Sequence, residues 1–279
     1  MTTPRVRLEA GDTHVEVDPA DGARLTSLVV DGRELLVTGS GGGVGYGCFV
    51  MAPWAGRLRD GRVSADRRTL QLRREPDDGH ALHGLVHDRP WTLEATGPDR
   101  ARLHGTVPAA SLDRADPSVG ADGWFTRIDL VQDIHLHPDR LELRLTATPT
   151  APTPCTLGWH PWFRRHLDDA EVVLDVPAAQ VLRKDRVGIA TLETVPVPAP
   201  PWDDAFTGLT GPVRLRWPGM LELELHSDAP VVVVFTGRTY GVCVEPQSGP
   251  PDEPNLAERR MAGPDDPLTL TSTWRWRTA

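Results

Sequence analysis

Hydrophobic and polar residues alternate along much of the chain, in short runs that turn-forming residues separate. The alternation is strict at 140–145 and 221–226, where leucine takes every second position and charged or polar residues take the others. It also runs through 127–136, with one slip at Val131, and through 268–276. A period of two places apolar side chains on one face of a β-strand and polar ones on the other. The pattern therefore predicts amphipathic strands in these segments.

The connections between these runs favour antiparallel pairing. The tripeptide His-Pro-Asp at 137–139 has turn chemistry, so the runs on either side of it are expected to form a hairpin. Segments 231–235 and 242–244 are apolar at consecutive positions, which is typical of strands buried on both faces. No stretch of ten residues combines helical apolar spacing with capping residues.

Composition supports the same fold class. The 279 residues include 26 glycines and 27 prolines, a density that excludes a helical bundle, and the 39% hydrophobic content excludes disorder. The proline-rich segments 148–154 and 195–201 have strand patterns on both sides, so we interpret them as connections rather than domain linkers. We predict one all-β domain over 1–279, a large antiparallel β-sandwich of two face-to-face sheets with few or no helices.

Charge and cysteine content narrow the class of partner. The net charge of −9 disfavours nucleic acid and anionic membrane surfaces, and no apolar run approaches the ~20 residues of a membrane span. The three cysteines are far apart without Cys-x-x-Cys spacing, which disfavours a disulfide framework or a structural zinc site. We expect a cytoplasmic protein with no membrane or nucleic-acid partner, and the sequence leaves open whether it is a monomer or a homodimer.

Two common enzyme signatures are missing. The glycine-rich stretch 39–45 contains neither a dinucleotide-binding motif nor a P-loop, and no Gly-x-Ser-x-Gly elbow occurs anywhere. Redox and phosphoryl-transfer chemistry therefore have little support, and we interpret the stretch as a surface loop.

The first two chemistry-bearing segments contain arginine and histidine. Arg57 lies in a turn-rich segment, where its guanidinium suits hydroxyl or carboxylate ligands but is equally compatible with a solvated surface arginine. His80, His83 and His87 invite a metal interpretation, but Gly84 and the flanking turn residues oppose the helix that would align them. We favour a polar site without a metal, and a structural turn is the alternative.

The later segments contain aromatic and acidic residues. His160 precedes Trp162, whose flat apolar face suits a sugar ring, although a lone histidine can also be a satisfied core residue. Glu245 follows a hydrophobic strand, where burial would raise its pKa and make it a base near neutrality, unless it is an ordinary strand end. Asp203 and Asp204 form a carboxylate pair beside aromatic residues.

The order of these segments resembles the aldose 1-epimerase (galactose mutarotase-like) family. The resemblance runs from about residue 52 to 255 and includes Leu-His-Gly, His-Pro-aromatic-Phe, Asp-x-x-Phe and Glu-x-Gln. It implies a β-sandwich of the galactose mutarotase-like supersandwich type and an isomerase that interconverts the α and β anomers of a free aldose without cofactor or metal. By resemblance, Glu245 is the base, His160 is the acid, and His83, Arg57, Asp203 (or its neighbour Asp204) and Trp162 bind the sugar.

The chemistry sets one geometric expectation and leaves three alternatives. Ring opening takes a proton from the anomeric hydroxyl and delivers one to the ring oxygen, so we expect Glu245 and His160 on opposite edges of the sugar, a ring-sized gap apart. A hexose-phosphate mutarotase would need a cationic pocket, for which Arg57 and Arg59 are candidates. A glycoside hydrolase would use Glu245 and Asp203, and a carbohydrate-binding module would need no base. The sequence does not identify the sugar.

Overall fold

The computed structural model describes residues 4–39, 43–65, 67–110 and 120–278. Its regular structure in these residues consists of β-strands and two single-turn 3₁₀ helices, η1 (Arg59–Gly61) and η2 (Glu253–Asn255). The predicted all-β fold with few or no helices is therefore confirmed. Within the same residues, no helix combines the length and the apolar character that crossing a bilayer requires.

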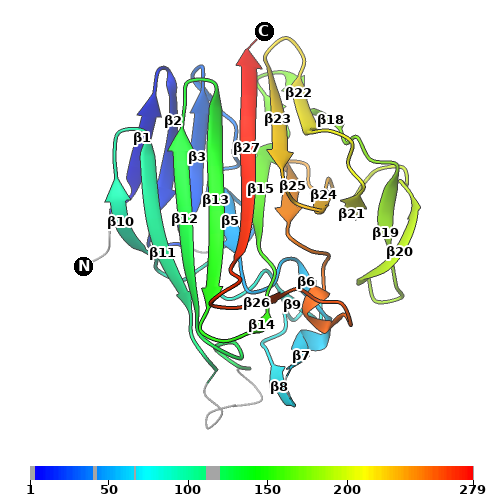
Figure 1. Ribbon diagram of the computed structural model, residues 1–279. Helices are drawn as coiled ribbons and strands as arrows, with labels where there is room; N and C mark the ends of the chain where they lie inside the picture. The colour runs from blue at the N-terminus through cyan, green and yellow to red at the C-terminus, as the bar shows by residue number, and fades with distance from the viewer. Residues whose placement is uncertain (1–3, 40–42, 66, 111–119, 279) are drawn as a thin grey trace.

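Two large antiparallel sheets pack face to face (Figure 1). In spatial order the first contains β1 (Val6–Ala10), β2 (Thr13–Asp18), β3 (Arg24–Val30), β5 (Cys48–Met51), β15 (Gly158–Arg164), β25 (Gly241–Gln247), β24 (Val231–Phe235), β21 (Asp203–Thr207), β19 (Gln180–Lys184) and β20 (Ala190–Pro196), with β4 (Arg33–Glu34) beside β3. The second contains β10 (Thr92–Thr96), β11 (Arg100–Val107), β12 (Ile128–Leu136), β13 (Arg140–Pro149), β27 (Leu268–Thr278), β23 (Leu221–Ser227), β22 (Val213–Trp217) and β18 (Val173–Asp175). We call them the 11-stranded and the 8-stranded sheet.

Four two-stranded ribbons complete the strand inventory of the described residues. They are β14 (Thr153–Pro154) with β26 (Met261–Ala262), β16 (His166–Leu167) with β17 (Ala170–Glu171), β6 (Arg57–Leu58) with β9 (Ala81–Leu82), and β7 (Arg62–Ala65) with β8 (Arg68–Gln71). Most of them lie in the loops at one end of the sandwich, below the large sheets in Figure 1.

The predicted hairpin forms between β12 and β13, with Leu136 opposite Leu141. Along β12 every second residue faces the core, so the slip in the pattern affects both Val131 and its neighbour Gln132. Gln132 is a polar residue on the buried face, and Val131 is half-exposed on the outer face. The amide of Gln132 accepts a hydrogen bond from the indole N–H of Trp159 at 2.9 Å and donates one to the carbonyl of Ala23 at 2.9 Å. These bonds satisfy the buried amide and join the two sheets.

Strand β15 divides its side chains between the core and the opposite face of the 11-stranded sheet. Trp159 and Phe163 belong to the large core between the sheets, whereas Trp162 belongs to a small cluster with Phe49 and Cys243 on the other side. Strand β25, next to β15, alternates in the same way. Alternate side chains of the two strands therefore point to the outer side of this sheet, where they surround a pocket.

Candidate active site

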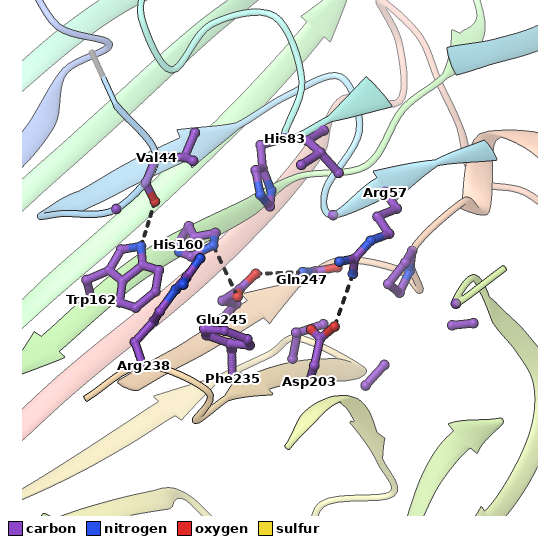
Figure 2. A pocket seen from close by; sticks show the side chains of 18 of the residues that line it. Val44, Arg57, His83, His160, Trp162, Asp203, Phe235, Arg238, Glu245 and Gln247 are labelled. Carbon is purple, nitrogen blue, oxygen red and sulfur yellow. Dashed lines mark hydrogen bonds and ion pairs between the residues drawn. The ribbon is translucent and has the colours of Figure 1, made fainter. Parts of the chain in front are cut away.

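A pocket of about 220 Å³ lies on that outer side of the 11-stranded sheet (Figure 2). All six site residues predicted from the sequence line it: Arg57, His83, His160, Trp162, Asp203 and Glu245. They come from strands, turns and ribbons that are far apart in the chain, and the fold brings them together at one place.

His160 and Glu245 touch each other at the centre of the pocket. The strand pairs Gly158–Gln247 and Trp162–Cys243 bracket them, so they face each other across β15 and β25. Nε2 of His160 lies 3.3 Å from Oε1 of Glu245, and both side chains are buried. The expected ring-sized gap between them is therefore wrong, because adjacent strands are only about 4.8 Å apart and hold the two groups in contact.

Burial acts on the two groups in opposite directions. It raises the pKa of Glu245 well above its usual value, and the charge of Asp203 adds to that effect, while Gln247 and Arg57 oppose it. Burial lowers the pKa of His160 to about 3. Both shifts favour the uncharged forms, which are a protonated Glu245 and a neutral imidazole at His160.

Gln247 is a further residue at this centre that the sequence analysis did not single out. Its Nε2 donates to Oε2 of Glu245 at 3.2 Å, and its Oε1 has no hydrogen-bond partner among the described residues although the side chain is fully buried. The spacing Glu-x-Gln on a strand was the available signal, because residues two apart share a face. Gln247 orients the carboxyl of Glu245 and leaves an acceptor in the pocket wall.

Arg57 enters the pocket from β6 and is held by two carboxylates. Its Nε donates to Asp78 at 2.9 Å and its Nη1 to Asp203 at 3.4 Å. The neighbouring Asp204 does not line the pocket. Its carboxylate accepts a hydrogen bond from the backbone N–H of Asp203 and lies 3.3 Å from Nζ of Lys184. Of the two adjacent aspartates, the one that faces the pocket is Asp203.

His83 lies beside His160 because of a strained turn. It has a positive φ of 61°, followed by Gly84 at 82°, and its ring meets that of His160 edge to face with centroids 4.8 Å apart. Its Nδ1 lies 3.1 Å from Sδ of Met51. Burial lowers the pKa of His83 well below its usual value, so it is a neutral donor or acceptor at the pocket wall.

The other histidines of that segment have separate surroundings. Nδ1 of His80 accepts from the backbone of Asp60 at 3.0 Å, and His87 packs against Phe49 with ring centroids 5.5 Å apart. Of the three, only His83 lines the pocket. Among the described residues, the groups arranged as metal ligands are His160–Cys243–Glu245 and His135–His137–Glu142, and neither includes a histidine of this segment.

Trp162 forms part of the wall with little open surface. Its indole N–H donates to the carbonyl of Val44 at 2.6 Å, and its ring stacks with His160 and with Tyr240. These contacts leave it 6% exposed. Trp162 therefore offers the pocket less open surface than the stacking face that its sequence context suggested.

Several other lining residues carried no recognisable sequence signal. They are Val44 and Gly45 from the glycine-rich stretch, and Lys184, Phe235, Arg238 and Tyr240. Residues 40–42 of that stretch lie outside the described residues, but its end forms part of the pocket wall rather than only a surface loop. Each of these residues reaches the pocket through a loop or strand pairing that local sequence does not specify.

Comparison with known proteins identifies similar folds. Similar folds occur in a protein from Escherichia coli provisionally described as an aldose 1-epimerase (20% identity, TM-score 0.82, covering 99% of both chains) and in an aldose epimerase homologue from C. elegans (15% identity, TM-score 0.82, covering 99% of both chains). A galactose 1-epimerase from Lactobacillus acidophilus has 17% identity and a TM-score of 0.76, with 99% of this chain and 94% of that chain covered. No curated protein sequence matches the chain significantly.

At these identities the solved structures establish the fold alone. The family itself is shown by a sequence model described as aldose 1-epimerase, which matches residues 4–209, about three quarters of the chain. The protein belongs to the aldose 1-epimerase family, whose members are isomerases.

Proposed function

We propose that the protein is an aldose 1-epimerase that interconverts the α and β anomers of a free aldose. The observation that carries this proposal is the buried contact between His160 and Glu245 at the centre of a small pocket. The pocket volume of about 220 Å³ lies below the roughly 300–1,000 Å³ of drug-sized ligand sites, which suits a single sugar ring.

A contacting acid–base pair can perform both proton transfers from one side of the sugar. The anomeric hydroxyl and the ring oxygen are bonded to the same carbon, so groups 3.3 Å apart reach both of them. Glu245 takes the proton of the anomeric hydroxyl, His160 gives one to the ring oxygen, and the bond between that oxygen and the anomeric carbon breaks. Rotation about the bond to the next carbon and the reverse transfers close the other anomer. Each group contributes roughly 10²–10⁴-fold.

The pair needs one proton in total, and the site supplies it. In the uncharged form of the pair that proton is on Glu245, and its transfer to His160 produces a carboxylate base and an imidazolium acid. The charge of Arg57 and the hydrogen bond from Gln247 both stabilise that carboxylate. Because the reaction only exchanges protons, we propose that it needs no metal or redox cofactor.

Substrate binding is proposed for the polar groups around the pair. Neutral His83, Arg57 and the Asp203 carboxylate face the pocket and can exchange hydrogen bonds with sugar hydroxyls. Trp162 and Phe235 supply apolar walls against the C–H edges of the ring.

A hexose-phosphate mutarotase is the second candidate, and one residue favours it. Arg59 does not line the pocket and is bound to Asp185 and Asp252, so it does not serve as the phosphate ligand that the sequence suggested. Arg238, by contrast, lines the pocket and has no carboxylate within ion-pair distance in the described part of the chain. A free guanidinium at a sugar pocket suits a phosphate group.

NMR exchange spectroscopy on a panel of aldoses tests the proposal. We expect accelerated anomer exchange for at least one neutral aldose, and loss of at least 100-fold in His160→Gln. If only glucose 6-phosphate is turned over, and Arg238→Gln abolishes that turnover, the phosphosugar candidate replaces the first. No acceleration with any sugar contradicts both, and glycoside cleavage that survives in His160→Gln indicates a hydrolase.

A further inference from the structure

Two imidazoles and a carboxylate gather on the outer face of the 8-stranded sheet, at the hairpin between β12 and β13. His135, on β12, lies directly opposite Glu142 on β13, and His137 follows at the start of the turn. The ligand atoms of the three residues lie within 4.8 Å of one another. None of them lines the pocket described above, so this cluster has no part in the proposed reaction.

The distances are close to those of a metal site. Oε2 of Glu142 lies 3.4 Å from Nε2 of His137 and 4.0 Å from Nδ1 of His135. Ligand atoms about 2.1 Å from a tetrahedral zinc ion are about 3.4 Å apart, so small side-chain rotations suffice. Nε2 of His137 is buried and, among the described residues, makes no hydrogen bond of good geometry, so its one polar neighbour is the carboxylate of Glu142.

Asp99 is a carboxylate partner for the second ring nitrogen of His135, as metal-binding histidines usually have. Its Oδ2 lies 3.3 Å from Nε2 of His135, and its backbone carbonyl accepts from Leu136 at 2.8 Å. A carboxylate on one ring nitrogen fixes the proton there and leaves the other nitrogen, Nδ1, free to bind a metal. This arrangement points Nδ1 of His135 toward the Glu142 side of the cluster.

Two arginines border the cluster: Arg140 contacts the other oxygen of Glu142, and Arg100 pairs with the carboxylate of Asp99. Arg140 donates from Nε to Oε1 of Glu142 at 2.7 Å and from Nη1 to Asp139 at 3.0 Å. Oε2 of Glu142 therefore stays available between the two imidazoles. Asp139 offsets part of the charge of Arg140, and Asp99 offsets part of that of Arg100.

From this geometry we infer that His135, His137 and Glu142 form a binding site for a divalent transition-metal ion, with water as the fourth ligand. Two imidazoles and one carboxylate suit Zn²⁺, Ni²⁺ or Cu²⁺ and disfavour Mg²⁺ and Ca²⁺. A bound ion joins β12, β13 and the turn between them, and through Asp99 it also steadies the turn between β10 and β11.

Calorimetric titration of the full-length protein with Zn²⁺ tests the inference, with Co²⁺ absorption as a second readout of ligand geometry. We expect one strong site per chain, a Zn²⁺-dependent rise in melting temperature, and a Kd at least ten times larger in His135→Gln and in His137→Gln. The matched control is His226→Gln, which removes a histidine 3.2 Å from Glu224 on the same sheet but without a second imidazole. Its Kd should stay within twofold of the wild-type value.

Unchanged Zn²⁺ affinity in the double variant His135→Gln/His137→Gln overturns the inference. In that case the binding site is elsewhere, and inhibition of anomer exchange by Zn²⁺ would locate it at His160, Cys243 and Glu245. Equal affinity for Mg²⁺ also overturns it. Circular dichroism of each variant without metal confirms that the fold is intact, since the substituted side chains are partly exposed at a sheet surface.

Discussion

The protonation of His160 and Glu245 determines the pH range of the proposed reaction. The pair carries one proton at pH values above the pKa of His160, about 3, and below the raised pKa of Glu245. With ordinary pKa values the working form, ionised glutamate beside protonated histidine, would be restricted to about pH 4.3–6.5. We therefore expect kcat/KM at pH 4 to lie within twofold of that at pH 6, and activity to fall only as the pH rises through the raised pKa of Glu245.

The measurement is an initial-rate pH profile, corrected for spontaneous mutarotation in each buffer. A loss of activity on the acid side near pH 4.5, while the protein stays folded, would contradict the one-proton pair. It would show instead that Glu245 ionises as an exposed glutamate does.

The buried carboxyl of Glu245 also costs stability at high pH. Because its pKa is raised in the folded state, the folded protein keeps a proton that the unfolded chain releases above about pH 4.3, so stability falls as the pH rises from there. Glu245→Gln removes that ionisation. We expect this variant to be more stable than the wild type at pH 8, with the difference closing toward pH 4.

Urea unfolding at the two pH values measures this difference. A variant that is less stable than the wild type at both pH values would show that Glu245 is not held in its uncharged form. A pH-independent gain would assign the effect to packing rather than to ionisation.

At the scale of single residues, the sequence predicted which side chains belong to the site but not the distances between them. The six predicted residues line one pocket because each follows a strand or turn signal that limits where it can point. The 3.3 Å contact of His160 with Glu245 depends on the pairing of β15 with β25, some 80 residues apart, and no local pattern encodes it. The same is true of Arg238 and Lys184, which resemble ordinary surface cations in the sequence.

At the scale of elements, the turn after β9 explains the motif Leu-His-Gly. Gly84 has a φ of 82°, and a Cβ atom at this position would lie 2.2 Å from the carbonyl oxygen of Ala52. The close approach lets Leu85 donate to that carbonyl at 2.7 Å, which fixes the turn that carries His83. Only glycine satisfies both the conformation and the space.

Gly84→Ala is therefore expected to destabilise the protein by at least about 2 kcal/mol and to displace His83. The matched control is Gly79→Ala in the loop before β9, where φ is 77° but no atom lies within 4 Å of the added Cβ. It should cost only the backbone strain, about 1 kcal/mol. Thermal unfolding and KM for the preferred sugar measure the two effects; equal losses in both variants would contradict the steric explanation.

The strands were predictable where the sequence alternates between apolar and polar residues or forms a short apolar run. Alternation located β12, β13, β23 and β27, and the apolar runs located β24 and β25. Strand β15, with the sequence Gly-Trp-His-Pro-Trp-Phe-Arg, shows no alternation, because its two faces pack against the core and the small cluster beneath the pocket. Its place in the sheet is evident only in the fold.

At the scale of the whole molecule, the buried amide of Gln132 joins the two sheets next to the strand that carries His160. Gln132 of the 8-stranded sheet bonds Trp159 of the 11-stranded sheet and the carbonyl of Ala23. Gln132→Leu leaves the indole N–H and that carbonyl buried without partners. We expect a loss of about 2–4 kcal/mol of unfolding free energy.

Urea unfolding of Gln132→Leu beside Val131→Thr tests this bridge. Val131 precedes Gln132 and faces outward, so its replacement should change stability by less than about 0.5 kcal/mol. If Gln132→Leu were as stable as the control, the hydrogen bonds between the sheets would be energetically neutral.

The sandwich could be predicted from composition and periodicity, but the order of its strands could not. In the 11-stranded sheet β5, β15 and β25 are neighbours although about 100 and 80 residues separate them in the chain. Such pairings depend on the packing of the whole molecule, and the pairing of β15 with β25 brings His160 and Glu245 together in the pocket.

Anomer exchange followed by NMR in the wild type and Glu245→Gln is the most direct test of the acid–base pair. The two side chains have nearly the same shape, and glutamine can still contact His160 and Gln247, so binding should be retained while proton transfer is lost. We expect the exchange rate to fall at least 100-fold with KM changed by less than about threefold. Exchange at the wild-type rate in Glu245→Gln would contradict the proposal that this pair opens the sugar ring.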